Sequence, residues 1–359
     1  MNLKNITKLK DILLCISLFL ISVGMAFYPA EISSAVKDSV MRCLNILIPS
    51  LFVFIAASSM LVSSGCLRIL TKPFKWIPLV FFRMPENIFT VFLISTFAGY
   101  PVGIKTLSDM LDSGEIDAET AEKAACFCYC GGPAFYSGAI GLTVFGSKEV
   151  GLLIFLSVLL SNIVIAFIMC RTSELKENRI VYEKRNGDLL VGSITLAGKS
   201  MGVICMTVIF FSAVTALLEA GGILDFLQHI FGLSDNETVM LSAFMEITSL
   251  SELHGSPYRL LPFICAVCSF GGLCIIIQLF ALKSEKLSMF SFIKHRPLAA
   301  LLSAVLCKIL QPHLISETVT AVSYNHNLVK VNNLSASLCL IFMIFLLNYK
   351  KGLVFSDRV

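Results

Sequence analysis

Charged residues are scarce in this sequence of 359 residues. Asp, Glu, Lys and Arg make up 14% of the chain, against about 25% in soluble domains, whereas 56% of the residues are hydrophobic. The longest polar stretch runs only from Arg171 to Asp188. The composition therefore excludes a soluble globular protein and leaves no room for a separate soluble domain.

Recognisable catalytic and metal-binding motifs are also missing. The sequence has no H-E-x-x-H motif, no G-x-x-x-x-G-K-S/T phosphate-binding loop and no nucleophile–base pair. Cys126, Cys128 and Cys130 lie close together, but no His or second Cys pair flanks them at zinc-ligand spacing. We therefore expect no enzyme, no metal site and no cofactor. The net charge of +4 needs no nucleic-acid partner, since membrane topology accounts for the basic excess.

Long uncharged stretches dominate what is present. Eight runs of 18 or more residues contain no Asp, Glu, Lys or Arg: 12–30, 43–67, 87–104, 124–147, 151–170, 200–218, 260–282 and 331–349. A helix that crosses the hydrocarbon core of a bilayer needs about 20 apolar residues. Shorter or charged apolar stretches occur at 238–253 and 297–312. The sequence predicts an all-α polytopic membrane protein whose first partner is the lipid bilayer.

Two of these runs contain helix-breaking residues, Gly131-Gly132-Pro133 within 124–147 and Gly271-Gly272 within 260–282. Interrupted backbone at membrane depth is tolerated only where protein or water covers it. We predict that both runs are re-entrant hairpins, which gives about eight transmembrane helices plus two hairpins.

The two halves of the chain resemble one another. Three residues after Arg42 match three residues after Lys199 at one constant offset: Phe54, Ala56 and Leu61 against Phe211, Ala213 and Leu218. Each half then reaches its Gly-Gly segment. We predict an inverted-topology repeat with these units: an N-terminal membrane helix 1–30, a first repeat 31–170, a cytoplasmic loop 171–190, a second repeat 191–312, and a C-terminal loop and helix 313–359.

The distribution of basic residues predicts the orientation. Cytoplasmic loops of membrane proteins are enriched in Lys and Arg. With both hairpins non-crossing, 21 of the 28 Lys and Arg residues fall on one side, together with both termini and loop 171–190. We therefore predict that this side is cytoplasmic and that the acidic loop 105–122 faces the opposite side.

Polar side chains inside apolar runs are candidates for a binding site. Glu246 lies in the middle of a predicted span, where a carboxylate marks an ion or substrate path or, alternatively, is a neutral hydrogen-bonded structural group. Thr248 and Ser249 add hydroxyl groups beside it. Asn162 and Gln278 are further candidates, although a membrane amide commonly bonds a neighbouring helix instead.

The segment Gly99-Tyr100-Pro101-Val102-Gly103-Ile104-Lys105 is either a tight turn or one wall of a binding site. Two glycines and a proline end a helix and allow close approach of the backbone. This segment and the predicted hairpin tips supply further candidates for the binding site: Gly99, Tyr100, Pro101, Gly103, Lys105, Cys130, Gly131, Gly132, Pro133, Gly271 and Gly272.

Several of these segments resemble one family. The stretches 48–54, 99–105 and 113–116, Phe127-Cys128, Glu246-Ile247-Thr248 and 269–273 are similar to the sporulation integral membrane protein family typified by YlbJ. The resemblance covers roughly residues 40 to 310. It implies nucleoside-recognition Gate domains, a fold similar to concentrative nucleoside transporters, and a location in the inner membrane of an endospore-forming bacterium.

The chain departs from the family pattern at two points. Tyr129 and Cys130 stand where an Asn is usual, and Ser249 and Leu250 stand where a Gly is usual. The resemblance therefore leaves two functions open: binding or transport of a small polar solute, nucleoside-like and coupled to Na⁺ or H⁺, or a scaffold for assembly of the spore envelope. Whether the protein forms a homo-oligomer also stays open.

Overall fold

The computed structural model describes residues 21–64, 81–172, 189–255 and 257–315, and the single residues 15, 18, 19 and 175. Every regular element in this part of the chain is a helix. Four helical stretches within it are long and apolar enough to cross a membrane: Lys148–Thr172, Leu189–Ala220, Tyr258–Leu282 and Phe290–Leu314. The predicted all-α membrane class is confirmed. The run 331–349 lies outside the described residues, and so do residues 12–14, 16, 17 and 20 of the run 12–30.

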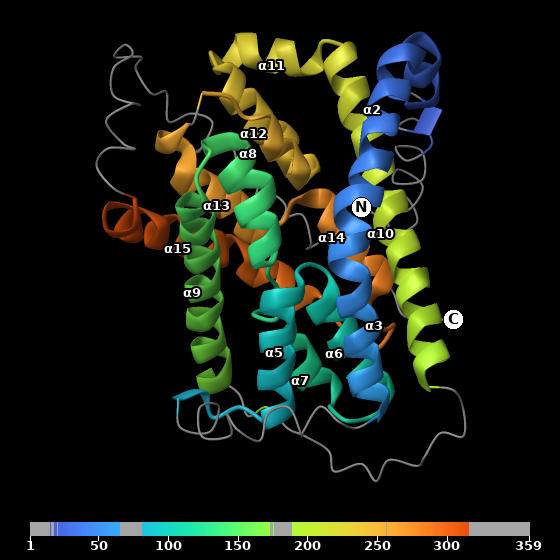
Figure 1. Cartoon of the computed structure of the whole chain (residues 1–359), viewed down its shortest axis with the longest axis vertical. Coiled ribbons are helices and arrows are strands. Elements are labelled where there is room, and N and C mark those ends of the chain that lie inside the picture. Colours follow the sequence, from blue (N-terminus) through green and yellow to red (C-terminus); the bar gives the residue numbers. More distant parts are fainter. Residues whose placement is uncertain are drawn as a thin grey trace, which may run out of the picture.

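The first half of the chain begins with a nearly continuous helix that passes through a π-helical turn. Its described elements are α2 (Pro29–Arg42), η1 (Cys43–Leu47), α3 (Ile48–Ser64), α5 (Glu86–Ala98), α6 (Val102–Asp112), α7 (Ala118–Ala125), η4 (Phe135–Leu142), α8 (Thr143–Phe145) and α9 (Lys148–Thr172). In Figure 1, α2 and α3 run beside α10, and both pack against it.

The second half follows the same order of long helix, short helices and final long helix. Its described elements are α10 (Leu189–Ala220), α11 (Ile223–Phe231), α12 (Asp235–Met245), η5 (Ile247–Glu252), η6 (Tyr258–Leu260), α13 (Leu261–Phe270), α14 (Gly272–Leu282) and α15 (Phe290–Leu314). A Ser234/Glu237 capping box begins α12, because both side chains bond the free amides of the first turn.

The chain folds back on itself at two positions, and neither is a predicted hairpin. Helix α5 packs against α6, with Gly99, Tyr100 and Pro101 between them. Gly99 has φ +88°, which favours glycine, and Pro101 follows a cis peptide bond. In the second half α12 packs against η5, and Glu246 alone separates them. The runs 87–104 and 238–253, predicted as crossings, therefore contain the fold-backs.

The Gly-Gly segments interrupt helices, as predicted, but they do not form the expected hairpins. The helix α13 packs mainly against α15 and α9, whereas α14 packs mainly against α10, α12 and α6, so most of their neighbours differ. Likewise α7 packs mainly against α6 and α15, whereas η4 packs mainly against α9. A glycine break can redirect a helix without reversing it, so the break alone did not determine which segments fold back.

The acidic loop of the first half lies beside a basic segment of the second. Ser284 Oγ donates to Asp112 Oδ1 at 2.6 Å, and Ser291 Oγ donates to Glu122 Oε1 at 2.6 Å. The predicted topology put residues 283–296 inside and loop 105–122 outside. The prediction that loop 105–122 and residues 283–296 lie on opposite sides is wrong. The fold-back of α5 and α6 returns the chain to the side from which α5 began, so the loop lies on the same side as residues 283–296.

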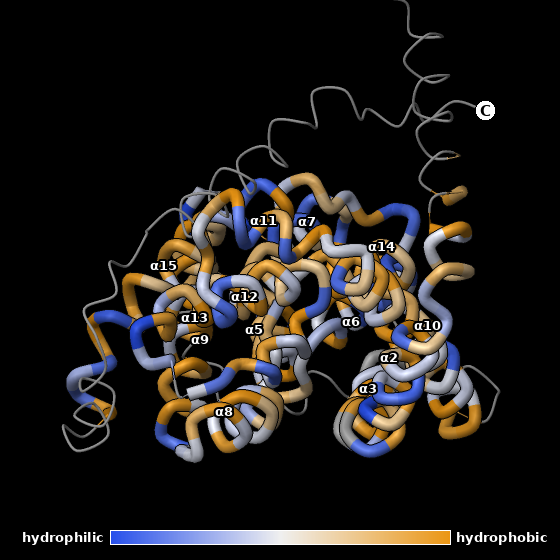
Figure 2. Tube along the Cα trace, turned by 90° about the horizontal axis from the view of Figure 1, so that it is seen from above, coloured by the Kyte–Doolittle hydropathy of each residue, from blue (hydrophilic) through white to orange (hydrophobic). Residues whose placement is uncertain are grey.

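The outer surface of the long helices is strongly apolar. Figure 2 shows hydrophobic residues on the outward-facing parts of the chain as well as inside it. Large side chains of this kind on α9, α10 and α15 are more than a third exposed: Phe167, Ile168, Met206, Phe210, Leu301, Val305 and Ile309. An apolar surface of this extent fits contact with lipid rather than water.

Candidate functional site

A cavity of about 460 Å³ lies where the two fold-backs and the two helix breaks meet. We call it the central cavity. Tyr100 of the first fold-back, Gly131 and Gly132 of the first break, and Glu246 and Thr248 of the second fold-back line it. Just beyond the second break, α14 contributes Cys274, Ile275 and Gln278 to its wall. This volume is in the range of small-molecule sites.

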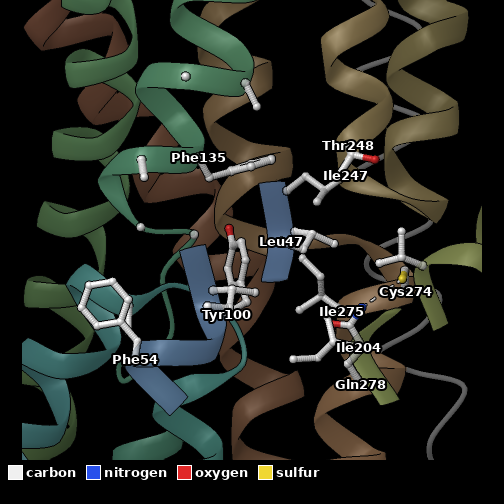
Figure 3. Close-up of a pocket in the computed structure, with 18 of the residues that line it drawn as sticks. Leu47, Phe54, Tyr100, Phe135, Ile204, Ile247, Thr248, Cys274, Ile275 and Gln278 are labelled. Atoms are coloured by element: carbon white, nitrogen blue, oxygen red, sulfur yellow. Dashed lines mark hydrogen bonds between the residues drawn. The ribbon is translucent and has the colours of Figure 1, made fainter. Parts of the chain in front are cut away.

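The wall of the cavity is divided into an aromatic part and a polar part. Figure 3 shows Phe135 and Tyr100 on one side, and Thr248, Cys274 and Gln278 on the other. The Gln278 amide donates to Cys274 Sγ at 3.3 Å, which fixes the amide at the edge of the space. Such a wall suits a ligand that has one apolar or ring face and a few hydrogen-bonding groups.

Glu246 is the only acidic residue among the described lining residues of the central cavity, and it is 2% exposed. It stands between α12 and η5, and its Oε1 accepts a hydrogen bond from the Thr248 amide at 3.0 Å. Its Oε2 accepts from the Thr248 hydroxyl. The side chain therefore caps the turn that follows it, and it also presents a carboxylate to the cavity.

A hydrogen-bonded network joins the two halves directly behind the cavity. The last turn of α13 leaves backbone carbonyls without partners inside the helix. Tyr100 Oη donates to Cys268 O, Tyr129 Oη donates to Phe270 O at 3.2 Å, and Arg296 Nη1 donates to Ser269 O at 3.4 Å. Residues from the first half and from α15 thus satisfy the carbonyl end of the second interrupted helix.

Arg296 connects the ends of both interrupted helices. It is 1% exposed, its Nη2 donates to Cys126 O directly after α7, and its Nη1 donates to Ser269 O in α13. Its guanidinium also stacks over the rings of Tyr129 and Phe292, each centroid 4.9 Å away. A cation at the carbonyl ends of two helices interacts favourably with both helix dipoles.

Ten of the sixteen predicted site residues lie outside the lining of the central cavity. Asn162 donates to Tyr129 O at 2.7 Å, so it bonds a neighbouring segment. Lys105 pairs with Asp109 one turn along α6. Ser249 lines a separate cavity. The others lie in or next to the fold-backs and breaks without lining the cavity: Gly99, Pro101, Gly103, Cys130, Pro133, Gly271 and Gly272.

Several lining residues were not predicted as site residues from the sequence. Phe54 and Leu51 of α3, Phe97 of α5, and Ile204 and Val208 of α10 form much of the apolar wall. In sequence they are indistinguishable from residues that face lipid, because both environments are apolar. Arg296 was visible only as one more basic residue near a predicted membrane boundary.

The long apolar helices and the cavity between interrupted helices together define a multi-pass helical membrane protein. Over 184 residues, the chain is 24% identical to the sporulation integral membrane protein YlbJ of Bacillus subtilis (strain 168). The similarity supports a YlbJ-like family for this chain. The match covers 50% of the chain and 44% of the relative, less than half of that protein's length.

No protein-family model matches the chain. No solved structure matches it.

Proposed function

We propose that this protein is a sporulation-associated integral membrane protein of the bacterial inner membrane that binds and moves a small polar solute through the central cavity. The observation that carries the proposal is the convergence of two fold-backs and two helix breaks on one cavity with a buried carboxylate. Interrupted helices that meet between repeats are the usual construction of a transporter substrate site.

The order of elements supports an inverted repeat. Each half contains a long helix, a fold-back, an interrupted helix and a final long helix: α3, α5–α6, α7–η4 and α9, then α10, α12–η5, α13–α14 and α15. We infer that the two fold-backs enter the membrane from opposite sides and that their tips form the two ends of the solute site. In that arrangement α5–α6 enters from the cytoplasmic side.

The wall narrows the class of solute. Phe135 and Tyr100 offer faces for a planar ring, while Glu246, Thr248 and Gln278 offer one charged and several neutral hydrogen-bonding groups. A nucleoside-like molecule has this combination of a ring with hydroxyl and amide groups. The substrate must also fit a space of about 460 Å³.

A screen of the detergent-solubilised protein tests the proposal. The panel contains nucleosides, nucleobases and unrelated metabolites of similar size, and the readout is the thermal midpoint of unfolding. A solute that binds only the folded state raises the midpoint, by an amount equivalent to about 2.7 kcal/mol at 100 times the Kd. Saturable stabilisation by one class supports transport or binding, and its absence across the panel contradicts it.

The second candidate function is a membrane scaffold needed for assembly of the spore envelope. One observation favours it: both carboxylate oxygens of Glu246 already accept hydrogen bonds from Thr248, so Glu246 has a structural partner without any solute. A scaffold requires the fold and its exposed loops but no solute, so a protein that supports sporulation with a blocked cavity is a scaffold.

A further inference from the structure

A second cavity, of about 320 Å³, shares Glu246 with the central cavity. We call it the acidic cavity. Its wall comes from α2, from the C-terminal part of α10 and from η5. Four exposed carboxylates surround it, and Glu246 lies buried between it and the central cavity: the exposed residues are Glu31, Asp38, Glu219 and Glu252.

The charge of the acidic cavity is strongly unbalanced. Among its described lining residues Arg42 is the single basic one, against five carboxylates. Arg42 Nη1 lies 3.7 Å from Glu252 Oε1, so one of these charges is already paired. The remaining carboxylates produce a negative field that concentrates cations in a cleft.

The deep part of the acidic cavity has an unused hydroxyl group. Ser212 is 6% exposed and lines the cavity, and its Oγ has no hydrogen-bond partner within the described part of the chain. Buried polar atoms normally have a partner, so this oxygen is available to a ligand. Ser249 and Thr215 are also buried in the wall.

We propose that the acidic cavity is the access route by which a monovalent metal cation reaches Glu246. The proposal rests on the proposed function, because it names the ion that acts at the same site. The Glu246 carboxylate and the Ser212 hydroxyl both line the acidic cavity and offer oxygen ligands of the kind that bind Na⁺ beside broken helices.

The spacing of the acidic residues sets the kind of cation. No group of three His, Cys, Asp or Glu side chains close enough to hold a metal ion occurs among the described residues. A divalent ion chelated by three such side chains therefore does not fit. A weakly held monovalent cation that is attracted by several separate carboxylates fits the acidic cavity.

The test compares the thermal midpoint of the solubilised full chain in NaCl, KCl and choline chloride at equal ionic strength and fixed pH. We expect Na⁺ or K⁺ to raise the midpoint saturably relative to choline. Asp38→Asn and Glu31→Gln should each weaken the apparent cation affinity about two- to fivefold, since exposed charges act through partly screened fields. Glu285→Gln removes an exposed acid that lies outside both cavities and should change nothing.

Arg42→Gln should change the apparent cation affinity in the opposite direction. Removing the one competing positive charge should strengthen the apparent cation affinity, whereas a general loss of folding would weaken it. Equal midpoints in all three chlorides would overturn the proposal, and so would a cation effect that Asp38→Asn and Glu31→Gln leave intact. If a solute binds saturably but independently of the cation, the acidic-cavity proposal fails while the proposed function stands.

Discussion

Glu246 combines a structural contact with a position in the walls of two cavities. Its two carboxylate oxygens accept bonds from the amide and the hydroxyl of Thr248, and the same residue lines both cavities. A carboxylate that only capped the turn would not need to line two cavities. The position between the cavities therefore favours a role in binding.

Glu246→Gln separates the two roles. The Gln oxygen can still accept from the Thr248 amide, so the fold-back should form, but the negative charge is lost. A charged hydrogen bond contributes about 1.5–3 kcal/mol, so we expect solute affinity to fall about ten- to a hundredfold. The measurements are solute binding and complementation of a sporulation defect, with membrane abundance as the control. Full complementation by Gln would assign Glu246 to the structure alone.

Gly271→Ala tests the packing at the second break. Gly271 has φ +94°, and an added Cβ would overlap Tyr129 Oη, which bonds Phe270. We expect the free energy of unfolding to fall by about 1–3 kcal/mol. Gly198→Ala is the matched control, because nothing lies within 4 Å of a Cβ there. Equal thermal midpoints for the two variants would show that this break tolerates a side chain.

Sequence reasoning located the polar part of the site but not the apolar part. Glu246, Thr248 and Gln278 were predicted because polar groups are expensive in an apolar run, and all three line the central cavity. Asn162 satisfied the same criterion, but it bonds Tyr129 instead. Lys105 was predicted from the turn segment 99–105, and it pairs with Asp109. Polarity marks a buried partner and a ligand site alike, so only the three-dimensional arrangement separates them.

At the scale of elements, the interrupted helices depend on a cation that joins their ends. Arg296 bonds Cys126 after α7 and Ser269 within α13, and it reaches both from α15. Its side chain is buried, and among the described residues no salt bridge to it is present. Carbonyl dipoles and aromatic faces, rather than a carboxylate, surround its charge.

Arg296→Met should destabilise the protein more than an ordinary helix substitution. It leaves the Cys126 and Ser269 carbonyls without their donor, and each such loss costs about 1–3 kcal/mol. Lys308→Met on the exposed face of the same helix should stay within about 0.5 kcal/mol of wild type. Thermal unfolding in detergent measures both. Equal losses of stability in the two variants would contradict the conclusion that Arg296 joins the ends of the two interrupted helices.

The elements themselves were only partly predictable. Glycine pairs correctly indicated where two helices break, since Gly271 and Gly132 adopt positive φ angles. They did not indicate which segments reverse direction. The reversals fall at Gly99–Pro101 and at Glu246, where packing of α5 on α6 and of α12 on η5 decides the path. The sequence predicted a tight turn as one alternative for residues 99–105, but it did not predict that α5 and α6 pack against each other. That packing involves residues far from the turn, which local sequence does not report.

At the scale of the whole molecule, the structure differs from the predicted topology in which segments fold back and which cross. This difference changes the side of the membrane on which two loops lie. Loop 113–117 moves to the side of residues 284–291, and the segment before α13 moves to the other side. With the predicted orientation, this topology would add Lys105 and Lys123 to the basic side of the membrane and remove Arg259 from it, so the bias of basic residues would be preserved. Composition alone therefore did not distinguish the two topologies.

Cysteine labelling in a Cys-depleted background tests this topology. Single cysteines at Glu119, Lys286 and Asp225 all occupy exposed positions. An impermeant thiol reagent added to intact cells should label the position in α11 and should leave the other two unlabelled until the membrane is opened. Labelling at Glu119 together with Asp225, while Lys286 stays protected, would restore the topology expected from the sequence.

The central claim is that a solute occupies the central cavity, and blocking that cavity tests it most directly. Gly138 lines the cavity, and nothing lies within 4 Å of a Cβ placed there, so Gly138→Phe should fill the space without disturbing the fold. The measurement is the binding isotherm of the most stabilising solute from the screen. We predict saturable binding to the wild type and its loss in Gly138→Phe, with the thermal midpoint of the solute-free protein unchanged. Equal binding by both proteins would contradict the account.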